Sequence, residues 1–333
     1  MEKKSINREI RKISNISSLP ILVYYVLSFL LLNLAKPHIF TLLRRSGVTV
    51  TENFDSFIQY ITIYLVIFPL AIIAFKVIRG KNNQIKLKSC FCKPERSIGW
   101  IVKWIVISFG TAMVVSYVFG IIGKIFSFEF NTLIGASVVT VPTYVVDILP
   151  AMIFAPFFEE ILFRGLIYKN NEMTGRWFSI IVSGLLFGFW HQTIEHIIFA
   201  SVVGMFCCFL YLKTKSIFPS MILHFILNSK SVLLENISAN INMYDITHDT
   251  INGIMNNITP ILLLLLTMLI IFAITVVGVI FLIREFVKNK KSIFSEKGVF
   301  EISTVNKTII YFTAPVTLIT YACLIYGTII RII

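Results

Sequence analysis

The sequence has few charged residues and few cysteines for its length, and both shortages limit its class. Of its 333 residues only 14% are Asp, Glu, Lys or Arg and 56% are hydrophobic, whereas a soluble globular chain has about 25% charged residues. The five cysteines contain no CxxC pair, so neither a disulfide framework nor a zinc motif is indicated. Several windows of about 20 apolar residues are each long enough to cross a bilayer. The sequence therefore predicts an all-α, polytopic transmembrane helix bundle.

Nine apolar segments are predicted to span the membrane. They lie at about 20–35, 56–75, 98–123, 143–168, 177–193, 195–212, 217–235, 259–283 and 308–330. With the N-terminus inside, 22 of the 30 Lys and Arg fall on cytoplasmic segments, 5 on outer segments and the other three within spans or at their edges. This bias is the positive-inside pattern. Basic loops facing anionic lipid then account for the net charge of +13 without a nucleic-acid partner. We predict a multi-pass cell-membrane protein with a cytoplasmic N-terminus.

The chain divides into three regions and shows no internal repeat. Residues 1–140 hold three transmembrane helices and a basic cytoplasmic loop, and residues 141–235 hold four spans with most of the polar motifs. Residues 236–333 hold a polar outer loop and two further transmembrane helices. The first apolar segment lacks a small-residue cleavage site, so we expect a retained signal anchor that stops at Lys36-Pro37.

Small residues in the middle region predict close helix packing. Gly184 and Gly188 share one face of a span, and Ala200 and Gly204 share a face of the next. Faces of this kind let helix backbones approach each other in lipid. We expect a turn near Thr193 to separate these two spans.

Charged side chains lie inside the fourth span, where each costs about 2.5–3.5 kcal/mol on insertion scales. Glu160 and Arg164 are i,i+4 and share a helix face, so they are predicted to form an ion pair. Glu159 points about 100° away and has no cation on its own helix. Because Pro156 has no N–H for the carbonyl of Met152, we expect a kink one turn before the carboxylates. Glu159 is the candidate chemical group, in a setting that suits a general acid or base.

Two more polar clusters lie in neighbouring apolar segments. His191 closes the fifth span, where a lone His is more often structural than catalytic. His224 and Asn228 are i,i+4 in the seventh span, and two donors on one face suit a developing oxyanion. A polar seam between helices is the alternative for this pair. By depth along their helices, the groups are predicted to meet near the bilayer midplane.

The ordered motifs Glu-Glu-x-x-x-Arg, Phe-x-x-x-His and His-x-x-x-Asn resemble the CAAX protease and bacteriocin-processing (CPBP, Abi) family of intramembrane endopeptidases. The resemblance covers residues 141–235 and depends on Glu159, Glu160, Arg164, Phe187, His191, His224 and Asn228. It implies an all-helical, four-span catalytic core.

The resemblance also implies a role for each group. Glu159 and His191 would activate a water for attack on a peptide carbonyl, and His224 and Asn228 would stabilise the oxyanion. Glu160 and Arg164 would be supporting residues. The preferred interpretation needs no cofactor, with Glu159 as a metal-free base. Zinc held by Glu159, His191 and His224 is the alternative.

The predicted partners are the lipid bilayer and a membrane-anchored protein or peptide substrate, cleaved near the cytoplasmic half of the bilayer. Two other functions stay open. One is a non-proteolytic membrane immunity or scaffold protein of the same family. The other is a transporter, although many transporters show an internal repeat and this chain does not. The Lys-, Asn- and Ile-rich composition favours an AT-rich bacterial source, where peptide maturation or defence is the expected setting.

Overall fold

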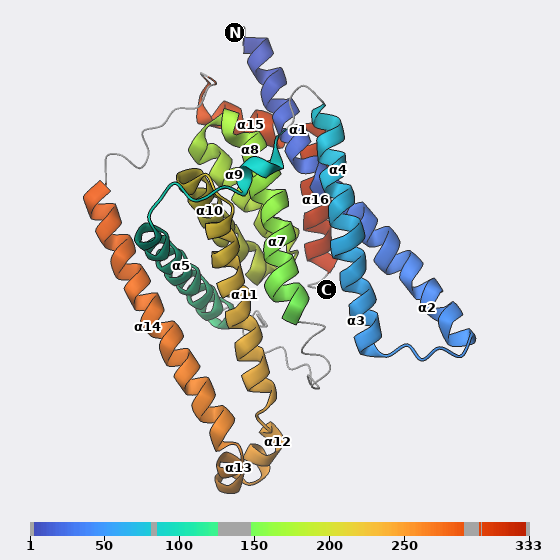
Figure 1. Ribbon diagram of the computed structural model, residues 1–333, viewed down its shortest axis with the longest axis vertical. Helices are drawn as coiled ribbons and strands as arrows, with labels where there is room; N and C mark the ends of the chain where they lie inside the picture. Colours follow the sequence, from blue (N-terminus) through green and yellow to red (C-terminus); the bar gives the residue numbers. More distant parts are fainter. Residues whose placement is uncertain (1–2, 81–84, 126–147, 290–299, 301, 331–333) are drawn as a thin grey trace.

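A computed structural model describes all residues except 1–2, 81–84, 126–147, 290–299, 301 and 331–333, and the described residues form helices without a strand (Figure 1). The helices before the motif region are α1 (Lys3–Ser28), η1 (Phe29–Ala35), α2 (Lys36–Arg45), α3 (Glu52–Ile61), η2 (Thr62–Ile67), α4 (Phe68–Arg79), η4 (Leu87–Cys90) and α5 (Ile98–Ile125). The motif region contains η5 (Pro150–Phe154), α7 (Ala155–Glu160), η6 (Ile161–Tyr168), α8 (Lys169–Asn171), η7 (Glu172–Thr174), α9 (Arg176–Trp190), α10 (Ile194–Thr214) and α11 (Phe218–Ala239). The last helices are α12 (Met243–His248), α13 (Thr250–Asn256), α14 (Ile258–Asn289), α15 (Thr304–Phe312) and α16 (Pro315–Ile330). The predicted all-α membrane bundle is confirmed.

In the part of the chain that the structure describes, four elements are π-helical, and three of them contain or adjoin a proline. The elements are η1, η2, η5 and η6. Pro37 follows η1, Pro69 follows η2 and Pro150 opens η5. A proline removes one backbone donor, and a π-turn is a rare element that occurs mostly as a single turn inside a longer helix. The first helix therefore continues through Lys36-Pro37 to Arg45, and the predicted stop at this point is wrong.

Many basic residues lie at the end of the bundle that carries α8 and the start of α1, at the top of Figure 1, and hydrogen bonds hold this end together. Arg79 at the end of α4 bonds Asn170. Lys169 Nζ lies 2.8 Å from Ser89 Oγ. Arg96 Nε lies 3.3 Å from the carbonyl of Lys213. We call this the basic end. The opposite, distal end carries the α2–α3 loop and the helices α12 and α13.

Five helices among the described residues are long and apolar enough to cross a membrane, or six if α15 and α16 count as one span. The ranges are Lys4–Arg45, Phe54–Arg79, Ile98–Ile125, His196–Thr214 and Ile258–Lys288. The predicted last span, 308–330, is instead bent by 73° between α15 and α16. The bend falls at Pro315, which lacks the N–H that a continuous helix requires. The predicted span 143–168 begins outside the described residues, and the total of nine spans stays a prediction.

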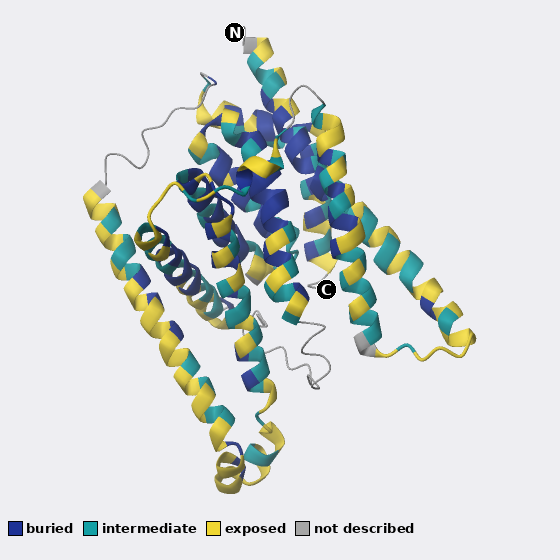
Figure 2. Ribbon diagram, viewed as in Figure 1, coloured by how far each residue is buried: buried dark blue, intermediate teal, exposed yellow. Residues whose placement is uncertain are grey.

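Two apolar clusters hold the motif helices between the flanking ones. The first joins residues of α1, α4 and α16 to α7, η6 and α9. The second joins α5 and α14 to α10 and α11. Figure 2 shows the buried residues concentrated in the centre of the bundle, while α14 exposes much of its length.

The predicted close contact between α9 and α10 is confirmed. A Cβ on Gly204 would lie 3.1 Å from the Cα of Gly184 and from the ring of Phe187. The predicted turn is also present, because α9 ends at Trp190 and α10 begins at Ile194.

Candidate active site

The candidate site is built around a distorted helix, η5–α7–η6. In a π-helix, the N–H of a residue donates to the carbonyl five positions earlier. The N–H of Ala155 still follows this register and donates to Pro150. In the same register Pro156, which has no N–H, would leave the carbonyl of Ala151 without a backbone donor. Asn228 of α11 satisfies this carbonyl, with its Nδ2 at 2.7 Å from the oxygen. The sequence, with an α register assumed, predicts that Met152 loses the bond, whereas the hydrogen bond from Asn228 goes to Ala151.

Glu160 and Arg164 form the predicted ion pair, and both side chains are fully buried. Arg164 Nη1 lies 2.7 Å from Glu160 Oε1, with an exposed fraction of 0% for each side chain. Arg164 Nη2 donates to the carbonyl of Gly204 at 3.3 Å. Its guanidinium lies 4.4 Å from the ring centroid of Phe187. A buried charge needs such compensation, because the cost of removing it from water is several kcal/mol.

His224 lies between the two adjacent carboxylates. Its Nδ1 is 3.0 Å from Oε1 of Glu160, and its Nε2 is 3.8 Å from Oε2 of Glu159. A carboxylate only accepts, so Nδ1–H donates to Glu160 and sets the tautomer of the ring. The imidazole is thereby held with Nε2 toward Glu159.

Glu159 differs from its neighbour because, among the described residues, its ion-pair partner is His224 at 3.8 Å and not an arginine. Its Oε2, like Oε2 of Glu160, is buried and has no hydrogen-bond partner among the described residues. The side chain as a whole is nearly buried, with the residue 6% exposed. An orphan buried carboxylate oxygen calls for an explanation, and a bound water is a common one.

His191 lies at the end of α9, and a backbone carbonyl of the same helix holds its side chain. Its Nδ1 is 2.8 Å from the carbonyl of Phe187, which can only accept, so this nitrogen carries the proton. In the neutral ring, Nε2 is then the acceptor nitrogen. Phe187 packs edge-on against both His191 and His224, with ring centroids 4.9 and 5.8 Å away. The Phe of the Phe-x-x-x-His motif therefore spaces the two imidazoles.

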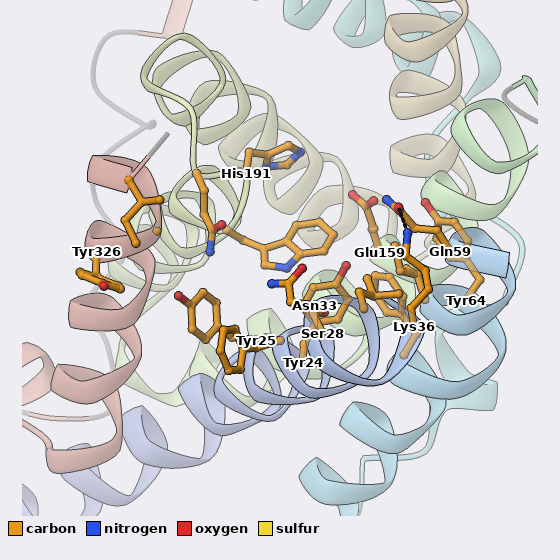
Figure 3. A pocket seen from close by; sticks show the side chains of 18 residues that line it. Tyr24, Tyr25, Ser28, Asn33, Lys36, Gln59, Tyr64, Glu159, His191 and Tyr326 are labelled. Carbon is orange, nitrogen blue, oxygen red and sulfur yellow. Dashed lines mark hydrogen bonds between the residues drawn. The ribbon is translucent and has the colours of Figure 1, made fainter. Parts of the chain in front are cut away.

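Glu159 and His191 face a common cavity of about 710 Å³ (Figure 3). Its lining residues come from three regions of the chain, and they are Tyr24, Tyr25, Ser28, Phe29, Leu32, Asn33, Lys36, Gln59, Ile63, Tyr64, Phe68, Glu159, Trp190, His191, Gln192, Tyr326, Gly327 and Ile330. His224 and Asn228 do not line it. The structure thus places His191 and His224 against Phe187 and Glu159 beside His224, while Asn228 turns its amide to the backbone of η5.

Most of the cavity wall was not predicted, because it comes from the flanking helices. Lys36 Nζ lies 2.6 Å from Asp55 and 3.4 Å from Gln59, at the end of the cavity away from the basic end. A signal was present in the sequence. Asn33 and Gln59 are polar residues inside apolar segments, the same feature that pointed to Glu159.

The three residues considered for zinc do not form a metal centre as they lie. Among the described residues, no group of three or more His, Cys, Asp or Glu side chains is arranged to hold a metal ion. Glu160 takes one nitrogen of His224 and the carbonyl of Phe187 takes one of His191.

The described residues thus combine a helical membrane bundle with an acid–imidazole cluster at one end of a cavity. The comparisons with known proteins make this more specific. Residues 141–229 match the sequence model of the family described as "Type II CAAX prenyl endopeptidase Rce1-like". The chain is also 28% identical over 145 residues to the "Putative membrane peptidase YdiL" of Bacillus subtilis, across 42% of this chain. No solved structure matches it significantly.

These matches support the predicted resemblance: the motif region of the chain is similar to the CAAX protease and bacteriocin-processing family. The matched part spans 58% of the length of the Bacillus relative. All the motif residues lie inside the matched segment 141–229.

Proposed function

We propose that the protein is an intramembrane endopeptidase that hydrolyses a peptide bond of a small membrane-associated protein or peptide. The observation that carries the proposal is the buried Oε2 of Glu159, which has no hydrogen-bond partner among the described residues and belongs to a side chain lining the cavity. The family match supports the same activity.

In the proposed reaction, Glu159 and His191 activate a water in the cavity. Glu159 takes a proton from the water while the oxygen of the water attacks the peptide carbonyl. His191 Nε2 accepts a hydrogen bond from the same water and so orients it. The proton then passes to the leaving amine, so that one water is consumed and one C–N bond is broken. General acid–base assistance of this kind contributes about 10²–10⁴-fold to a rate.

His224 and Asn228 are the proposed oxyanion donors. Asn228 Nδ2 has two N–H groups, and the carbonyl of Ala151 uses one of them. His224 presents Nε2 beside Glu159, and it donates from this nitrogen when the ring carries its second proton. Substrate binding has to bring the reacting carbonyl to these donors, because neither side chain lines the cavity.

We further propose that the reaction needs no metal, and the position of Glu159 in the cavity wall supports its direct action on a water. The test is exhaustive dialysis of the purified protein against a chelator, followed by elemental analysis and a cleavage assay. Unchanged cleavage is expected. Loss of cleavage that zinc alone restores would replace the metal-free mechanism with the zinc alternative.

The main test of function is comparative peptidomics of cells that carry the wild type or Glu159→Gln. The substitution keeps the shape of the side chain and removes its basicity. We expect a precursor to accumulate, and cleavage by the purified variant to fall about 10²–10⁴-fold. Glu172→Gln is the matched control, because Glu172 lies at the basic end and pairs only loosely with Lys215 at 4.0 Å. Unchanged peptides in the Glu159 variant would refute the proposal.

A further inference from the structure

Along the helix axes, the cavity that Glu159 lines occupies one half of the bundle only. Its inner limit is Glu159, which is 10 residues from Lys169 and thus about 15 Å along the helix from the basic end. Ser17 bonds Asn171 near the basic end, and Lys36 lies 19 residues further along the same helix, about 28 Å away. This length is close to the thickness of the hydrocarbon core, about 30 Å. The cavity therefore runs from the middle of the bundle toward the distal end.

The lining residues of the α1–η1–α2 helix, α9, α16 and the α3–η2 helix all lie toward the distal end. The lining part of α1, η1 and α2 is the half remote from the N-terminus. On α9 the lining residue is its last, Trp190, and on α16 the lining residues Tyr326, Gly327 and Ile330 lie in its last turns. The wall from α3 and η2, with Gln59 and Tyr64, precedes the part of the helix that reaches the basic end at Arg79.

The basic end of the site is covered instead. The segment 85–97 crosses η6, where Leu87 packs so closely that it lies 3.2 Å from a Cβ built on Gly165. The segment is fastened to the α10–α11 connection by backbone bonds, from Ile217 N to the carbonyl of Cys90 at 2.9 Å and from Glu95 N to that of Thr214 at 2.9 Å. Buried apolar residues fill the space beneath it.

We infer that the substrate reaches Glu159 from the distal end, opposite the basic loops. This inference rests on the proposed function and replaces the expectation that cleavage takes place near the cytoplasmic half of the bilayer. Under the positive-inside rule the distal end faces outward. The substrate class is then a peptide, or the membrane-proximal segment of an anchored protein, on the extracytoplasmic side of the membrane.

The chemistry of the cavity fits a short extended segment of polypeptide. Tyr24, Tyr64 and Trp190 give it large amphipathic surfaces, which bind an apolar side chain and still offer polar tips. Asn33 and Gln59 lie nearer the distal end along their helices, where they offer donors and acceptors to a peptide backbone. Bulky apolar residues next to the cleaved bond are therefore expected in the substrate.

The test is labelling with a membrane-impermeant maleimide from each side of the membrane. Asn33→Cys is placed in a Cys92→Ser, Cys323→Ser background, and the three buried cysteines stay in place because buried thiols are inert. The control is Cys323→Ser alone, which keeps Cys92 at the basic end. Asn33→Cys should be labelled in intact cells, and Cys92 only in inside-out vesicles. Labelling of both positions from the same face would overturn the inference. Gln59→Cys repeats the test if the first variant does not fold.

Cleavage measured after labelling tests the route itself. A bulky maleimide on Asn33→Cys should slow cleavage of the substrate found by peptidomics at least tenfold, while the same reagent on Cys92 should leave it unchanged. Full cleavage after complete labelling at Asn33→Cys would exclude this route. The labelling pattern does not depend on turnover. If the proposed function is wrong, Glu159→Gln will leave the peptides unchanged, and the labelling will still decide from which side the cavity is reached.

Discussion

The motif region and the flanking helices contribute different things to the same site. The motif region, from η5 to α11, supplies the buried charges and the imidazoles, which are held by contacts within a helix, as for Arg164 and His191, or between helices, as for His224. The flanking helices supply most of the cavity wall, with mainly aromatic and uncharged polar side chains. Chemistry and access are therefore encoded in separate parts of the chain, and only the first has a compact sequence signature.

The same contrast appears between the two adjacent carboxylates. Glu160 accepts from both Arg164 and His224 and has no access to the cavity, whereas Glu159 faces the cavity. One residue step around a helix turns the side chain by about 100°. This step separates a structural carboxylate from one that is available for chemistry.

Removal of Arg164 should have the largest effect on stability, and it sharpens the contrast between the carboxylates. Arg164→Ala leaves the charge of Glu160 buried with one partner fewer, which costs about 3–5 kcal/mol. Glu159→Gln should change stability little, because Oε2 of Glu159 has no hydrogen bond to lose among the described residues. The measurement is reversible unfolding in mixed detergent micelles.

Lys215→Ala is the control for this comparison, since its ion pair with Glu172 spans 4.0 Å with both side chains partly exposed. Such pairs contribute about 0–1 kcal/mol. If Arg164→Ala is no more destabilising than this control, the buried pair does not hold the site together.

The link between Asn228 and the proline-distorted helix should give a smaller effect. Asn228→Ala leaves the carbonyl of Ala151 without its donor, at a cost of about 1–3 kcal/mol. Pro156→Ala restores a backbone N–H to this turn, so the loss caused by Asn228→Ala should be smaller in that background. Unfolding of the four proteins of the double-mutant cycle measures the coupling. Additive losses would mean that Asn228 is not the substitute donor for the proline.

The same cycle separates two roles of Asn228. If its amide also stabilises an oxyanion, cleavage should fall in both backgrounds even where stability is restored. Recovery of cleavage together with stability would reduce Asn228 to a positioning residue.

Much of the motif region could be predicted from the sequence, because its signals are local. A charge within an apolar span is costly, so its presence marks a site, and helical spacing then assigns Arg164 to Glu160 and leaves Glu159 apart. The pairing of His224 with Glu160 was not predictable, because it depends on how α7 and α11 approach each other. The roles of all four candidate catalytic residues stay predictions.

Neither the cavity nor the helix distortions could be predicted from the sequence. Pro156 indicates that a backbone donor is missing, but the choice between an α- and a π-register decides which carbonyl is affected. Lys36 reads as the end of a span, yet the helix continues to Arg45 and places Lys36 beside Asp55 of the next helix. Such long-range neighbours follow from the packing of whole helices, which composition does not determine.

The ion pair at the distal end of the cavity should have the smallest effect on stability and still bear on access. Lys36 Nζ lies 2.6 Å from Asp55, with the Asp55 side chain 40% exposed, so Lys36→Met should cost no more than about 1 kcal/mol. The same ammonium also contacts Gln59 at the cavity wall. Its loss should therefore change the KM for the substrate more than kcat, as expected for a group that touches the substrate before the reaction rather than during it. Asp55→Asn breaks the same ion pair without removing the ammonium from the cavity. If the two variants change KM equally, the ion pair is only structural, and the flanking helices shape the cavity without selecting what enters it.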